Sequence, residues 1–193
     1  MINKKDFEKL IREIAAYDRQ RELLIKKSRD VLKLSKQLIY TLHRNNLSEA
    51  DRLAKQLQKE KAELDKLTVN FKGMDAEGSY SEALQEFAEA MCYYGYAKDK
   101  RIPSSHEIKV DAEDYLGGIS DLTGELTRKA VILAIEKDFK GVAAIRKIVD
   151  EIHELFLKMN LRNSTLRKKA DSIKWNLKKL EDIMYDVSLR SEK

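Results

Sequence analysis

Cysteine and proline each occur only once in this sequence of 193 residues, and glycine occurs seven times. A single cysteine, Cys92, excludes a disulfide within the chain and a cluster of thiolate metal ligands. Scarce proline and glycine leave few of the residues that interrupt helices. Together with abundant lysine, glutamate, leucine and alanine, this indicates a helical protein.

The sequence also lacks any apolar run near the roughly 18 residues that a membrane-spanning helix requires. Its first 20 residues carry charges throughout and do not follow the pattern of a signal peptide. We therefore expect a cytoplasmic protein without a membrane span. The net charge of +5, from 38 basic and 33 acidic residues, permits binding to nucleic acid but does not require it.

Apolar residues recur three or four positions apart along most of the chain, which predicts amphipathic helices. The expected helices cover 3–45, 49–71, 80–98, 111–137, 141–159 and 163 or 164 to 189, with a short turn at 104–107. The first would be about 60 Å long, so it should belong to an elongated bundle or pack on a neighbouring subunit. Ser48, with Asp51 three residues later, is expected to cap the second helix. We predict one all-α domain over 1–193, a bundle of six or seven helices.

Two pairs of acids lie in the two most apolar of these helices. Glu86 and Glu89 are one helical turn apart, as are Asp121 and Glu125, so each pair shares one helix face. Small residues beside both pairs would allow the helices to approach closely, and the four carboxylates could then converge. Converging carboxylates raise one another's pKa unless a hard cation lies among them. Oxygen ligands alone suit Mg²⁺, with Mn²⁺ as a substitute, and such a site can activate water for phosphodiester cleavage.

Spacing alone leaves other interpretations open for these acids. Carboxylates one turn apart often lie on a solvated face or beside a base, and Arg128 is placed to neutralise Glu125. A di-iron carboxylate site would require Glu-x-x-His motifs, and His43, His106 and His153 supply none of them.

Four separate blocks of the sequence resemble the translin–TRAX family, where TRAX is translin-associated protein X. The blocks YLGGISDLTGELTRKAV and LFLKMNLRNSTLRKKADSIKWNLKKLEDIMYDVSLR resemble the family as a whole. The blocks RELLIKKSRDVLKLSKQLIYTLHR and LQEFAEAMCYYGYAKDKRIPS resemble TRAX specifically. The resemblance extends from about Arg21 to Arg190. The chain as a whole resembles a prokaryotic, archaeal type of TRAX-like protein.

This resemblance implies an all-α subunit that assembles with itself into a hollow, barrel-like octamer. It implies a Mg²⁺-dependent endoribonuclease for single-stranded RNA. The catalytic and metal-binding acids would be Glu86, Glu89 and Asp121, with Glu125 beside them. The alternative is a non-catalytic homo-oligomer of the translin type that binds single-stranded nucleic acid and in which the acids are structural. The acidic segment KGMDAEGSYSEA stands where translin has a His- and Arg-rich segment, which argues against translin-style DNA binding.

Basic residues on the first expected helix complete the candidate site. Arg29, Lys33 and Lys36 follow one another at helical spacing and form a basic stripe, and His43 and Arg44 lie near the end of the same helix. Such a stripe binds phosphates without sequence preference. With the family resemblance, we predict that these five residues bind RNA, and a solvated helix face is the alternative.

Overall fold

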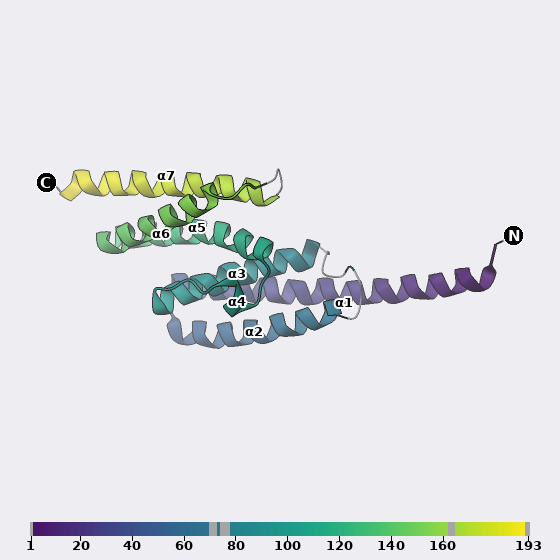
Figure 1. Ribbon diagram of the computed structural model, residues 1–193. Helices are drawn as coiled ribbons and strands as arrows, with labels where there is room; N and C mark the ends of the chain where they lie inside the picture. The colour runs from purple at the N-terminus through teal and green to yellow at the C-terminus, as the bar shows by residue number, and fades with distance from the viewer. Residues whose placement is uncertain (1, 70–72, 74–77, 162–164, 192–193) are drawn as a thin grey trace.

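The computed structural model describes residues 2–69, 73, 78–161 and 165–191 (Figure 1). Within these residues the chain forms seven helices and no strand. The helices are α1 (Lys4–His43), α2 (Leu47–Val69), α3 (Gly78–Asp99), α4 (Ser105–Ile108), α5 (Ala112–Ile135), α6 (Phe139–Leu157) and α7 (Thr165–Ser191). The predicted all-α fold is confirmed. None of the described helices is both long enough and apolar enough to cross a membrane.

The helices form an elongated bundle in which neighbours run roughly along the same axis (Figure 1). α1 packs on α2 and α3, α3 packs on α5, and α5 packs on both α6 and α7. The two helices that carry the acid pairs, α3 and α5, are therefore adjacent and lie in the middle of the bundle.

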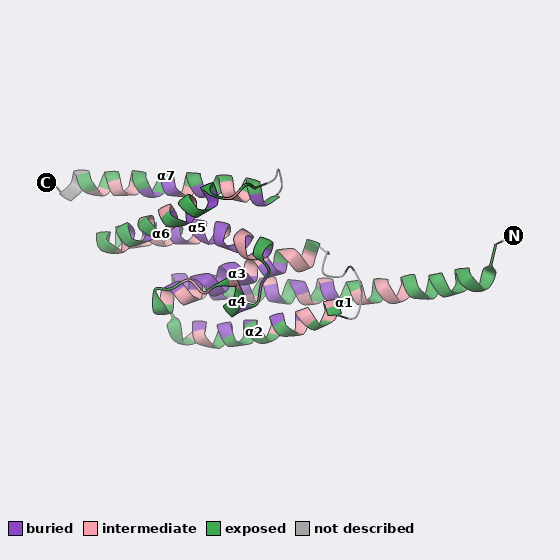
Figure 2. Ribbon diagram, viewed as in Figure 1, coloured by how far each residue is buried: buried purple, intermediate pink, exposed green. Residues whose placement is uncertain are grey.

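Buried apolar side chains line the facing sides of these helices (Figure 2), with fully buried examples in Leu38 of α1, Phe87 of α3 and Leu122 of α5. On α1 the buried residues begin only at Leu24. The N-terminal part of α1 projects beyond the other helices, as Figures 1 and 2 show, whereas Gln20 still donates to the carbonyl oxygen of Leu67 on α2. The bundle core therefore stabilises only the second half of the longest helix directly.

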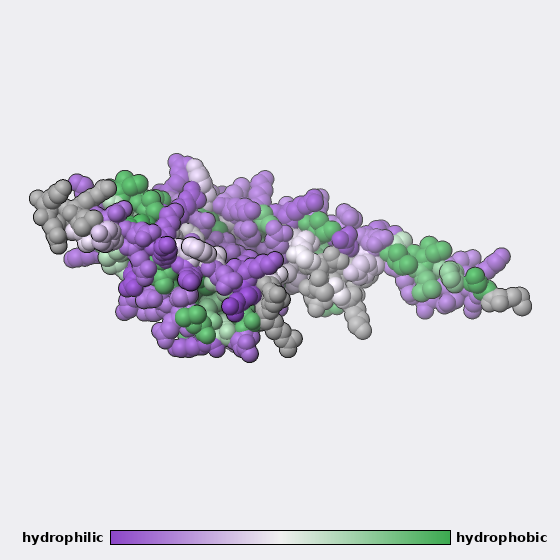
Figure 3. All heavy atoms as spheres, turned by 90° about the horizontal axis from the view of Figure 1, so that it is seen from above, coloured by the Kyte–Doolittle hydropathy of each residue, from purple (hydrophilic) through white to green (hydrophobic). Residues whose placement is uncertain are grey.

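The projecting part of α1 carries an apolar stripe at helical spacing that no other described segment covers. Its members are Phe7, Leu10, Ile11 and Ile14, which are between 43% and 63% exposed. Figure 3 shows apolar residues gathered on this projection. The apolar spacing that predicted a helix here is correct, but the apolar face of this helical segment lies outside the core of this chain.

The start of α2 differs from the expectation. The backbone amide of Glu49 donates to Oδ1 of Asn46 at 3.2 Å, so Asn46 caps the helix and the prediction of Ser48 was wrong. The reason is the tight turn after α1, where Asn45 adopts a positive φ of 56° and brings Asn46 to the first free amides of α2. The cap predicted at 163 or 164 lies outside the described residues.

Candidate acidic site and nucleic-acid interface

Two consecutive glycines bring α3 and α5 into contact. A Cβ atom at Gly118 would lie 2.6 Å from the carbonyl oxygen of Gln85 and 2.7 Å from Cβ of Ala88. A Cβ at Gly117 would lie 2.7 Å from Oε1 of Gln85. Only glycine fits at this crossing, because the neighbouring atoms on α3 include rigid backbone. The close approach places the acids of α3 opposite those of α5. We call Glu86, Glu89, Asp121 and Glu125 the acidic site.

Glu89 is the most buried member of the acidic site, with 7% of its surface exposed. No hydrogen bond or ion pair to its carboxylate occurs within the described part of the chain. Burial and the charges of Asp121, Glu86 and Glu125 raise the pKa of Glu89 to about 8, and Lys169 opposes this rise. The four acids thus lie near enough to influence one another, and Glu89 lacks a compensating partner.

Glu86 and Asp121 each face a base. Oε1 of Glu86 lies 3.6 Å from Nζ of Lys36 on α1. The pKa of Glu86 is nevertheless raised, because burial outweighs the attraction of Lys36. Asp121 pairs with Nζ of Lys169 on α7, and the same ammonium donates to Oε1 of Gln85 at 2.7 Å.

Glu125 is held by a buried histidine. Nε2 of His43 is hydrogen-bonded to Oε2 of Glu125, and the hydroxyl group of Tyr93 lies 3.2 Å from Nδ1 of the same ring. The hydrogen bond from His43 is the main reason that the pKa of Glu125 is lowered. Arg128 lies 3.8 Å from the same carboxylate oxygen, so the pairing considered from the sequence is present as an additional, longer contact.

The position of His43 differs from the exposed position expected of an RNA-binding residue. Its side chain is only 4% exposed, and both ring nitrogens face protein groups. His43 follows Lys36 by two helical turns and shares its face of α1. At that end of the helix Tyr93 of α3 and Glu125 of α5 cover this face, so the histidine belongs to the acidic site.

In this structure the four acids are not arranged as a complete set of metal ligands. Among the described residues, no three His, Cys, Asp or Glu side chains are arranged to hold a metal ion. The physical reason is that Asp121 and Glu125 are turned toward Lys169 and His43. The chemistry of the donors does fit a hard divalent cation, because the four acids offer only oxygen and Glu89 has no partner. The predicted binding of Mg²⁺ or Mn²⁺ therefore stays a prediction.

The basic stripe is exposed and reaches the acidic site. From here on we use this name for Arg29, Lys33 and Lys36, which are exposed on α1, together with the exposed Arg44 that follows the last residue of α1. Lys36 connects the stripe to the acids through its contact with Glu86. Tyr40 lies between Lys36 and Arg44, is 56% exposed, and has its ring centroid 5.7 Å from the guanidinium carbon of Arg44. An aromatic ring thus accompanies the cations where a nucleic acid would approach.

Sequence reasoning overlooked three residues of this region. Tyr40 follows Lys36 by four positions, so helical spacing alone contained the signal that places it on the stripe. Tyr93 follows Glu89 by four positions on α3, so helical spacing contained a signal for it as well. Lys169 carried no such signal, since it reaches the site from a helix whose packing the spacing does not reveal. The contacts of Tyr93 and Lys169 are with His43 and Asp121 respectively.

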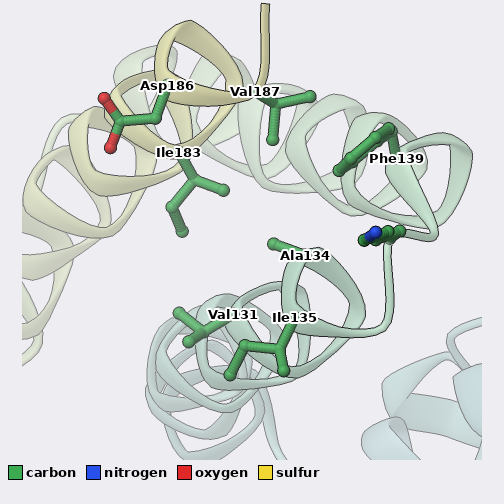
Figure 4. A pocket seen from close by; sticks show the side chains of 8 residues that line it. Val131, Ala134, Ile135, Phe139, Ile183, Asp186 and Val187 are labelled. Atoms are coloured by element: carbon green, nitrogen blue, oxygen red, sulfur yellow. The ribbon is translucent and has the colours of Figure 1, made fainter. Parts of the chain in front are cut away.

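A depression lined mainly by apolar side chains lies away from this site (Figure 4). It measures about 680 Å³ and is lined by Val131, Ala134, Ile135, Lys137, Phe139, Ile183, Asp186 and Val187. Most of these side chains are apolar, and none belongs to the acidic site or the basic stripe. The depression therefore has no part in the site described above.

Comparisons with known proteins agree with the fold. The chain is 38% identical over 81 residues to translin of Gallus gallus, a match that covers 42% of this chain and 35% of that protein, or about a third of its length. It is 27% identical over 192 residues to the translin-associated protein X homolog of Schizosaccharomyces pombe, covering 89% of this chain and 82% of that protein. The crystal structure of apo-NeC3PO matches with a TM-score of 0.88 and 26% identity over 97% of this chain and 98% of that one. A model of the Translin family matches residues 19–191. Since that match takes in almost the whole chain, this protein belongs to the Translin family.

Proposed function

We propose that this protein is a divalent-cation-dependent endoribonuclease that cleaves single-stranded RNA at the acidic site. The observation that supports it best is the state of Glu89, a buried carboxylate without a protein partner and with three other acids nearby. Burying a carboxylate without a counter-charge is costly, and a divalent cation would offset that cost. The resemblance to TRAX adds support, because the catalytic acids of TRAX correspond to Glu86, Glu89 and Asp121.

Different residues of the chain would have different roles in such a reaction. A bound Mg²⁺ or Mn²⁺ would supply Lewis acidity and a water of lowered pKa. Glu89 and Asp121 would bind the cation, with Glu86 and Glu125 beside them. A carboxylate that is not a ligand would accept the proton of the attacking water. The basic stripe would hold the phosphates of the RNA next to the acids.

Single-stranded RNA is the substrate class that suits this surface. The stripe offers exposed cations, which bind phosphates of any sequence. Tyr40 offers an exposed ring beside them, and unpaired bases can stack on such a ring whereas paired bases cannot turn toward it. We include self-assembly into a hollow octamer in the proposal, and the uncovered apolar stripe at the start of α1 supports an interface with another copy.

The second candidate is a non-catalytic homo-oligomer that binds single-stranded nucleic acid. One observation favours it: Glu86, Asp121 and Glu125 each contact a basic side chain of the protein itself. In that case the acids stabilise the packing of α1, α5 and α7, and the basic stripe alone carries the function. The two candidates differ in whether a cation is needed and whether RNA is cut.

Cleavage of a labelled single-stranded RNA distinguishes them. Wild type, Glu89→Gln and Glu82→Gln would be compared with Mg²⁺ and with EDTA, after all three are shown to have the same oligomeric mass. Glu82 is an exposed acid on the same helix and serves as the matched control. We expect wild type and Glu82→Gln to cleave only with Mg²⁺, and Glu89→Gln to be slower by roughly a hundredfold or more. Binding without cleavage by every protein would establish the non-catalytic candidate instead.

A further inference from the structure

Lys169 is a cation that the chain itself brings to the acidic site. It belongs to α7, whereas the acids belong to α3 and α5. Its ammonium group contacts Asp121 and donates to Oε1 of Gln85 at 2.7 Å, and its side chain is 27% exposed. Its charge also acts on Glu89, where it opposes the effect of the neighbouring acids. The ammonium therefore lies on Oδ2 of Asp121, one of the two oxygens with which that carboxylate could bind a divalent cation.

Hydrogen bonds fix the side-chain oxygen that receives Lys169. The amide nitrogen of Gln85 donates to Oδ1 of Asp114 at 2.9 Å and to Oγ of Ser81 at 3.1 Å. Both donor positions of Gln85 face these oxygens, so its amide oxygen is left to accept from Lys169. Asp114 is buried, and Gly117 leaves the space that the side chain of Gln85 occupies. These contacts thus fix the position of the Gln85 amide oxygen, which accepts the hydrogen bond from the ammonium.

The backbone of Lys169 is anchored as well. Oγ of Ser120 donates to the carbonyl oxygen of Lys169 at 2.6 Å, which ties the first turns of α7 to α5. The other lysine and arginine side chains that contact the acids are held less firmly. The side chains of Lys36 and Arg128 are 60% and 57% exposed, and their contacts with the acids measure 3.6 and 3.8 Å. Exposed pairs of this kind contribute little to stability, so Lys169 is the principal counter-charge among the lysine and arginine side chains at the site.

We propose that Lys169 is a built-in competitor for the divalent cation. Its ammonium balances the acidic site when no cation is bound, and it competes with an incoming cation for Oδ2 of Asp121. The proposal rests on the proposed function, since it takes the acidic site to be a cation site, and it adds a control on how readily that site is filled. The long, flexible lysine side chain can swing toward solvent while the backbone of α7 stays anchored. The site would therefore fill only when the cation is abundant enough to displace the lysine.

Binding of Mn²⁺ to the RNA-free protein tests this directly. Titration calorimetry would compare wild type with Lys169→Gln, which removes the charge, and Lys169→Arg, which keeps it. Lys168→Gln is the matched control, because Lys168 is the preceding residue of α7 and is exposed. We expect Lys169→Gln to bind Mn²⁺ about tenfold more tightly than wild type or tighter, since a repelling positive charge is gone. Lys169→Arg and Lys168→Gln should stay close to wild type.

Thermal unfolding provides a second readout that does not depend on cleavage. Without cation, Lys169→Gln should unfold at a lower temperature than wild type, because Asp121 loses its partner. Saturating Mn²⁺ should then raise the unfolding temperature of Lys169→Gln by more than that of wild type, since tighter binding stabilises the folded state more. Circular dichroism would confirm equal helix content before either measurement.

The outcomes separate this proposal from the proposed function. Equal or weaker Mn²⁺ binding by Lys169→Gln, with saturable binding by wild type, would overturn the competitor role and leave the cation site standing. Binding by Lys169→Gln alone would support the competitor role in its strongest form. No saturable binding by any of the four proteins would overturn both the cation site and the competitor.

Discussion

Glu89 is the acid whose charged form the folded structure disfavours most among the four acids of the site. Its carboxyl group has a pKa near 8 in the folded chain, compared with an ordinary value of 4.5, because burial and three neighbouring acids disfavour the charged form. The folded state therefore holds on to this proton more tightly than the unfolded state does. Between about pH 4.5 and pH 8 the folded state binds more protons, so stability has to fall as the pH rises through this range.

Replacing Glu89 with glutamine should remove this pH dependence. In the cation-free protein we expect Glu89→Gln to match wild type near pH 4.5 and to exceed its stability at pH 8.5 by on the order of 2–4 kcal/mol. Urea denaturation at several pH values measures the difference, and Glu82→Gln is the control on the same helix. Parallel pH profiles for wild type and Glu89→Gln would contradict the electrostatic account of the site.

At the scale of elements, the crossing of α3 and α5 depends on glycine at one position and tolerates a side chain at another. A Cβ at Gly118 would lie 2.6 Å from the backbone oxygen of Gln85 and 2.8 Å from the backbone nitrogen of Glu89. At Gly124, on the same helix, the nearest atom would be Nδ2 of Asn176 at 3.8 Å, which is an ordinary contact. The two glycines therefore form a matched pair for substitution.

Gly118→Ala should destabilise the protein by about 1–3 kcal/mol, because rigid backbone on α3 cannot move aside for the added methyl group. Gly124→Ala should be neutral or stabilise by up to about 1 kcal/mol, since alanine favours the helix and the space is free. Urea denaturation of both variants and wild type gives the comparison. Equal destabilisation by the two substitutions would mean that the close approach of the helices is not what the glycine permits.

For the whole molecule, the projecting part of α1 is the feature that one chain does not explain. Its apolar stripe is exposed, and a helical segment without packing is marginally stable in water. The stripe also lies on the surface of a chain whose core is complete without it. We therefore expect another copy of the chain to cover Phe7, Leu10, Ile11 and Ile14 in solution.

A double substitution, Phe7→Glu with Ile11→Glu, should lower the oligomeric mass, because two carboxylates cannot be buried in an apolar interface without partners. Analytical ultracentrifugation measures the mass. Arg12→Glu is the control, since Arg12 is an exposed polar residue of the same segment, and it should keep the wild-type mass. An unchanged mass for the double variant would show that the stripe is not part of the interface.

Local periodicity was enough to predict the helices and the pairing of the acids. The helix expected over 49–71 is Leu47–Val69, and the one expected over 111–137 is Ala112–Ile135. Glu86 shares a face with Glu89, and Asp121 with Glu125, because positions three and four apart always meet on a helix. The approach of α3 to α5 was also predictable in outline, since small residues mark helices that pack closely.

The sequence by itself thus determined the secondary structure, the helix faces and the membership of the site's acidic half. Only the tertiary structure decided which bases reach those acids. Lys169 lies 48 residues from Asp121 and His43 lies 82 residues from Glu125 in the sequence. No periodic pattern connects such positions, because their contact depends on how α1 packs against α3 and how α7 packs against α5. Because of that packing, a basic side chain contacts each of Glu86, Asp121 and Glu125, whereas Glu89 has no hydrogen-bonded or ion-paired partner among the described residues.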